Sequence, residues 1–204
     1  KTGQNRSSST ISASQWLLLN SPAYATLYHS TYEETRKAQV KLLSFQERLD
    51  QVIETAKQDL NQSIANAVTL PDGRKAHLDK DGFAWTINNE RVDDAVTTGI
   101  NWEGTEPRES HLGRLNNLQF LLEMQTTTET MGLRLGEIAD TAENDDPPHS
   151  MDELNALKDE SKVISEQLDV LSDKLNSTFS PSAPVVRSGN NLDAIRTANI
   201  VPVL

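Results

Sequence analysis

Between Pro22 and Pro71 the chain contains neither glycine nor proline, and this uninterrupted stretch most constrains what the sequence can fold into. Ser21 and Pro22 form a typical helix start, with a capping hydroxyl before a proline at the first helical position. A helix over residues 22–67 would be about 70 Å long at ~1.5 Å per residue. No compact core can cover so long a stripe, so we expect it to pack on other long helices or on a partner. The stripe recurs at helical steps of three and four and consists of Tyr24, Tyr28, Thr31, Thr35, Ala38, Leu42, Phe45, Leu49, Val52, Ala56, Leu60, Ile64 and Ala67.

Two later stretches carry the same helical period. One runs from about residue 107 to residue 142, and Pro147 and Pro148 must end it. The other begins at Ser150, which forms a capping box with Glu153. The first stripe is Leu115, Leu118, Leu121, Met124, Thr128, Met131, Leu135, Ile138 and Ala142. The second stripe is Leu154, Leu157, Ser161, Ile164, Leu168, Leu171 and Leu175, which is the heptad spacing of a coiled coil.

Residues 68–87 have a different character. Two turn signals, at Pro71-Asp72-Gly73 and at residues 79–82, separate three short alternating runs, which predicts a small β-meander. In its last run Phe83, Trp85 and Ile87 share one face. Residues 88–106 follow as an ordered loop.

These elements predict a mainly α fold, an elongated antiparallel bundle or coiled coil of three helices with the β-meander inserted at its tip. We expect residues 1–13 to be a disordered leader and residues 14–177 to be the bundle, with insertions at 68–87 and 88–106. Residues 178–204 are predicted to be an extended tail that contains a short helix at 192–198.

The composition excludes several classes of protein. The chain has no cysteine, so disulfides, thiolate metal sites and a cysteine nucleophile are impossible. A net charge of -11 argues against binding to nucleic acid or to anionic lipid. Residues 101–150 alone hold ten carboxylates and three arginines, a sum of -7. There is no apolar run long enough to span a membrane.

The sequence predicts no catalytic residue and no cofactor. No two of the four histidines, His29, His77, His111 and His149, stand at helical spacing. His77 with Asp79 and Asp81 is the one local set with metal-ligand chemistry, but aspartates are also common in turns for conformational reasons. No glycine-rich phosphate loop or nucleophile elbow occurs.

Three groups of side chains are candidates for binding a protein partner. Tyr24, Tyr28 and Tyr32 lie on one helix face, where they pack on a neighbouring helix or meet a partner. Trp85 and Trp102 pack the meander onto the helices or serve as exposed anchors. The apolar end of the chain docks on its own bundle or adds to a partner as an extended peptide, through Ile200, Val201, Val203 and Leu204.

The first functional hypothesis is therefore a non-catalytic interaction module, a helical scaffold, adaptor or assembly subunit that self-associates or binds a protein partner. Its expected architecture is similar to that of tip and translocator proteins of bacterial secretion machines. The Ser/Thr-rich residues 1–14 favour export over a cytoplasmic location. The chain begins with Lys1, so we expect a processed chain or a segment of a longer one.

Two alternatives stay open. The chain could be a secreted effector or toxin module, or an acidic inhibitor of one, that binds a basic partner through residues 101–160. It could instead be an enzyme with a carboxylate site in residues 88–111. That region contains Trp102, Glu103, Glu106, Glu109 and His111.

Overall fold

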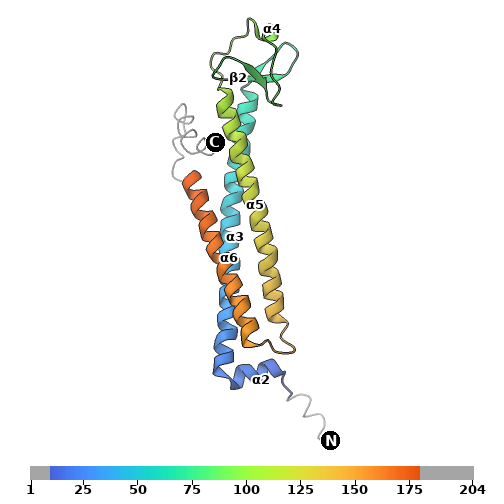
Figure 1. Cartoon of the computed structure of the whole chain (residues 1–204), viewed down its shortest axis with the longest axis vertical. Coiled ribbons are helices and arrows are strands. Elements are labelled where there is room, and N and C mark those ends of the chain that lie inside the picture. The colour runs from blue at the N-terminus through green and yellow to red at the C-terminus, as the bar shows by residue number, and fades with distance from the viewer. Residues whose placement is uncertain (1–9, 180–204) are drawn as a thin grey trace. The chain divides into compact units, whose positions relative to one another are not determined.

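The computed structural model describes residues 10–179 and confirms the predicted fold class (Figure 1). The described chain is mainly helical and has one small three-stranded antiparallel sheet. The helices are α2 (Ala13–Asn20), α3 (Pro22–Ala65), α4 (Asp94–Thr97), α5 (Arg108–Glu143) and α6 (Met151–Thr178). The strands are β1 (Val68–Thr69), β2 (Lys75–Leu78) and β3 (Ala84–Thr86). None of the described helices is long and apolar enough to cross a membrane.

The helix ends follow the local signals in the sequence. The Ser21 hydroxyl accepts a hydrogen bond from the backbone N–H of Tyr24 at the start of α3. Ser150 and Glu153 form both bonds of a capping box before α6. A second capping box, which joins Ser12 and Gln15, starts α2. These bonds satisfy backbone donors that the first turn of a helix leaves without partners.

The chain divides into two compact units, and each of the three long helices contributes to both. Among the described residues, the first unit, here called the helical unit, contains residues 10–46 and 126–172. The second, here called the sheet unit, contains residues 47–125 and 173–179.

In the helical unit, α3 contacts α6 through stripe residues of both helices and contacts α5 at Gly132. Ser161, the polar member of the α6 stripe, is buried and hydrogen-bonds the Thr35 hydroxyl of α3 at 2.8 Å. Gly132 of α5 lies close to Leu42 of α3: a β-carbon placed on Gly132 would be 3.2 Å from the Leu42 Cδ2. Most members of the stripes are buried in this unit: Tyr24, Thr31, Thr35, Ala38, Leu42 and Phe45 on α3; Thr128, Met131, Leu135 and Ile138 on α5; Leu154, Ser161, Ile164 and Leu168 on α6.

In the sheet unit, the strands run in the order β1-β2-β3, and the register pairs Ala76 with Thr86 and Leu78 with Ala84. Gly73 and Gly82 supply the positive φ angles that the two connecting turns require. The buried face of β3 carries Ala84 and Thr86, so Phe83 and Trp85 occupy the opposite face. A small apolar core consists of Leu70, Ala76, Ala84 and Val92, against which Leu78, Val96, Ile100 and Trp102 pack.

Residues 88–106 contain the short helix α4 in addition to loop structure. Of the predicted disordered leader, residues 1–13, the first nine lie outside the described residues, whereas Ser12 caps α2 and Ala13 begins it. The predicted helix at 192–198 and the apolar end with Ile200, Val201, Val203 and Leu204 also lie outside them.

Candidate functional site

The sheet unit contains a buried polar face that the sequence pattern did not predict. On α3 the buried positions after Leu49 include Asp59 and Ser63, whereas Leu60 and Ile64 are only half-buried. On the first three turns of α5 the buried face carries His111, Arg114 and Asn117. The predicted burial of Leu115 is wrong, since its side chain is 36% exposed. On both α3 and α5 the buried face continues along the helix with the same helical period. In the sheet unit, however, several of its positions hold polar residues.

Four side chains on this face form one contact cluster, here called the histidine cluster. They are Ser63 from α3, His77 from β2, Glu106 from the loop before α5 and His111 from α5. The two imidazole rings stack with their centroids 4.5 Å apart. His77 Nε2 lies 3.2 Å from the Ser63 carbonyl oxygen, and His111 Nδ1 lies 3.0 Å from the Ser63 hydroxyl. The same hydroxyl donates to the Glu106 carboxylate.

Arg114 completes the surroundings of Glu106. Its Nη2 lies 2.8 Å from Glu106 Oε2, and its Nε lies 3.2 Å from both carboxylate oxygens. Burial alone would raise the pKa of Glu106, but the hydrogen bonds from Arg114 and Ser63 outweigh it and lower that pKa. Glu106 is therefore an ionised carboxylate at neutral pH.

Both histidines of the cluster are neutral at pH 7. Burial, together with the neighbouring His77, lowers the pKa of His111 from 6.5 to about 4. Burial also lowers the pKa of His77. The bonds assign the protons: the Ser63 carbonyl can only accept, so His77 carries its proton on Nε2. Since the Ser63 hydroxyl donates to Glu106, His111 donates from Nδ1, and its Nε2 is buried with no hydrogen-bond partner.

The cluster suits metal binding better than acyl transfer. In a catalytic triad the imidazole lies between the serine and the acid, whereas here the serine lies between the acid and the imidazole. Two neutral imidazoles and one carboxylate are ligands for a divalent transition metal. One potential ligand atom from each of His77, Glu106 and His111 falls within 4.8 Å of the other two.

The structure brings together two of the residues proposed for an enzyme site in residues 88–111, Glu106 and His111. The other three lie apart from that pair. Trp102 packs on the small sheet core, Glu103 is exposed, and Glu109 accepts a hydrogen bond from the backbone N–H of Lys80 at 3.1 Å. Apolar periodicity could not indicate Ser63 and Arg114, because they are polar residues at buried positions of α3 and α5.

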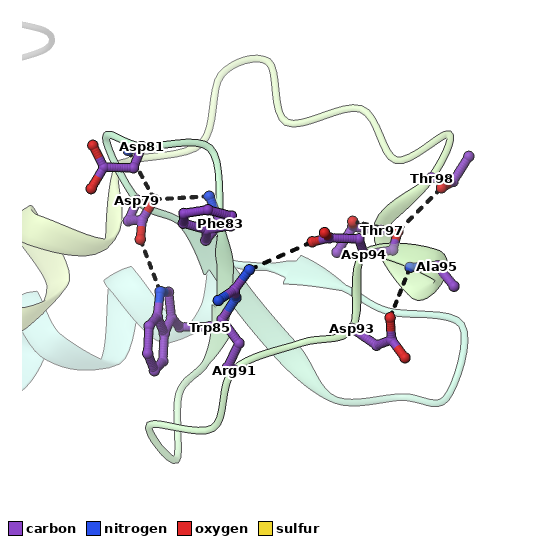
Figure 2. A network of polar contacts seen from close by, with 10 residues as sticks. All are labelled: Asp79, Asp81, Phe83, Trp85, Arg91, Asp93, Asp94, Ala95, Thr97 and Thr98. Atoms are coloured by element: carbon purple, nitrogen blue, oxygen red, sulfur yellow. Dashed lines mark hydrogen bonds and ion pairs between the residues drawn. The ribbon is translucent and has the colours of Figure 1, made fainter.

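Asp79 and Asp81, the other members of the local set around His77, lie in the turn before β3 (Figure 2). The Asp79 carboxylate accepts from the backbone N–H groups of Asp81 and Phe83 and from the Trp85 indole. The Arg108 guanidinium lies 4.0 Å from the centre of the Trp85 ring. The structure thus joins His77 to Glu106 and His111, while Asp79 organises the turn and Trp85.

The three tyrosines on α3 differ in exposure. Tyr24 is buried, Tyr28 is half-buried and stacks on it with ring centroids 6.3 Å apart, and Tyr32 is exposed. Of the three, only Tyr32 is mostly exposed.

A different surface of the helical unit exposes apolar side chains. On α2, Leu17 and Leu18 pack against a cluster of Tyr24, Leu27 and Leu154. Trp16 and Leu19 of the same helix are 55% and 76% exposed. An open groove of about 470 Å³ lies in this unit and is lined by Pro22, Ala23, Thr26, Leu27, Ser30, Met151, Asn155 and Lys158.

No protein-family model, curated protein or solved structure matches this chain.

Proposed function

We propose that the chain is a non-catalytic interaction module that self-associates through α2. The observation that carries this proposal is the distribution of apolar side chains on that helix. Leu17 and Leu18 cover one side and pack inward, whereas Trp16 and Leu19 extend from the other side into solvent. Residues 16–19 are four consecutive apolar residues that go round the helix, and a helical segment that is apolar all round is normally covered on every side. The exposed side of α2 therefore calls for a partner.

The charge pattern favours a second copy of the chain as that partner. Residues 7–32 contain no Asp, Glu, Lys or Arg, although charged residues make up 24% of the chain. Two chains of net charge -11 repel each other, and an uncharged surface is where that repulsion is weakest. Such a surface offers a charged foreign partner no ionic contact.

The groove beside the start of α3 supplies a complementary seat. Its lining is mainly apolar and includes Pro22, Leu27 and Met151, with Lys158 as its one charged residue. We assign Trp16 and Leu19 of one copy to the groove of the other. A two-fold axis would form this contact twice, which gives a closed dimer.

The test is the oligomeric state of the full chain by sedimentation velocity over a concentration series. We expect a dimer for the parent chain and a monomer for W16S/L19S. The matched control is V163S/V170S, which removes two comparably exposed apolar side chains from α6 in the same unit and should remain a dimer. M151K, which places a charge in the groove, should weaken the dimer.

Three results would overturn the proposal: a monomeric parent chain at 100 μM, a dimer that survives W16S/L19S, or a control that dissociates equally. Circular dichroism of each variant establishes that the helices are intact. A dimer that is lost in W16S/L19S but kept in M151K would refute the groove as the seat of Trp16.

A further inference from the structure

We propose that His77, Glu106 and His111 bind a divalent transition-metal ion of the zinc class. The three residues come from β2, from the loop before α5 and from α5 itself, so only the folded sheet unit brings them together. One ligand atom from each lies within 4.8 Å of the others. Two histidines and one carboxylate are the protein ligands of many zinc sites that keep an open position, and of non-haem iron sites.

The unpartnered nitrogen of His111 is an independent observation that points to a ligand. His111 is 3% exposed, and its Nε2 has no hydrogen-bond partner. Buried polar atoms without partners are rare in folded proteins and call for an explanation. A neutral imidazole nitrogen with a free lone pair is the form of histidine that coordinates a metal.

The surroundings hold the ligands in orientation as metal sites require. Ser63 contacts all three of them, through its carbonyl to His77 and through its hydroxyl to His111 and Glu106. Hydrogen bonds of this kind from neighbouring groups fix the tautomer and ring orientation of metal-bound histidines.

Glu106 gives the site both charge and access. The histidines are buried, but the Glu106 side chain is 21% exposed, which leaves an approach for a cation from solvent. Arg114 balances the Glu106 charge when no metal is bound. A bound dication would then leave a net positive site, which favours an anionic exogenous ligand such as hydroxide at the open position.

The experiment uses the full untagged chain after treatment with a chelator. Co²⁺ titration followed by visible absorption reports the coordination geometry, and Zn²⁺ competition follows. We expect one Co²⁺ per chain, a tetrahedral or five-coordinate spectrum, and displacement by Zn²⁺. H77Q, E106Q and H111Q should each weaken binding at least tenfold. The matched control is H29Q/H149Q, which removes the other two histidines and should bind like the parent.

A parent chain that shows no saturable Co²⁺ binding below 100 μM would overturn the proposal, as would a control that loses as much affinity as H77Q. If a variant of the histidine cluster does not fold, NMR of the histidine side chains in the parent chain during Zn²⁺ addition tests the site instead. Zn²⁺ must shift those of His77 and His111, and a shift confined to His29 or His149 refutes the site. Metal binding should persist in W16S/L19S, so this test is separate from that of self-association.

Discussion

The buried, neutral state of His111 predicts a specific loss of stability in acid. Its folded-state pKa of about 4 lies below the ordinary value of 6.5, so between these values the unfolded chain binds more protons than the folded chain. Its contribution to stability is therefore complete above pH 6.5 and is lost as pH falls towards 4. Two-state linkage with these two values gives a loss of about 2 kcal/mol between pH 7 and pH 5 from this residue alone.

His77 adds to this loss with the same sign, because its pKa is also lowered by burial. Glu106 acts in a different window. Its pKa in the folded chain is lowered from the ordinary 4.5, so its contribution is present above pH 4.5 and is lost only as pH falls below that value. The change in the free energy of unfolding between pH 7 and pH 5 therefore contains the contribution of the two histidines and none from Glu106.

The assay is urea unfolding of the chelator-treated chain, followed by circular dichroism at pH 7, 6 and 5. His111→Gln, which cannot titrate, should lose about 2 kcal/mol less than the parent chain over this range, whatever its stability at pH 7. His29→Gln is the control, because it removes an exposed histidine that lies outside the histidine cluster. An H111Q variant with the same pH dependence as the parent would refute the reasoning, as would a His111 resonance that titrates near 6.5.

Two further predictions concern the helical unit and use matched pairs on α5. Leu135→Ala, at a fully buried position, should destabilise the unit by about 2–5 kcal/mol. Leu133→Ala, at an exposed position, should change the free energy of unfolding by no more than about 0.5 kcal/mol. Equal losses of the two variants in urea unfolding would contradict the assigned helix face. Gly136→Ala should stabilise α5 by up to ~1 kcal/mol, since a β-carbon there meets nothing within 4 Å. Gly132→Ala should increase the stability less than Gly136→Ala, because its β-carbon would press on Leu42. A larger increase in melting temperature for Gly132→Ala than for Gly136→Ala would count against this packing.

Much of the fold could be predicted because its determinants are local. The period of the apolar residues marked the three long helices, and the serine caps and prolines marked their ends within a few residues. Even the polar Ser161 was assigned to the buried stripe, since the leucines on both sides of it fixed the phase. The small sheet followed from its two glycine turns.

The histidine cluster could not be predicted from apolar periodicity, since that criterion selects against the residues which form it. On α5, stepping back from buried Leu121 by four and then three residues reaches Asn117 and Arg114. Apolar periodicity instead favoured Leu115 and Leu118 for the buried face, because both are apolar. Continuing the phase regardless of residue type would have identified the buried polar face. No local signal could have joined His77 to His111, which are 34 positions apart (111 − 77) and meet only through tertiary contacts.

The polar face is itself an argument that the sheet unit does more than fold. The ion pair of Arg114 with Glu106 is largely withdrawn from solvent, and ion pairs in such surroundings can often be replaced by apolar residues without loss of stability. The same unit uses Leu70 and Val92 where packing alone is required. Asn117, 1% exposed with no partner for either amide atom, adds a further cost that an apolar residue would avoid. Stability therefore gives no reason for these polar residues to lie in the interior of the sheet unit. The proposed metal site does give one, because the polar residues orient two neutral imidazoles and a carboxylate around one cation.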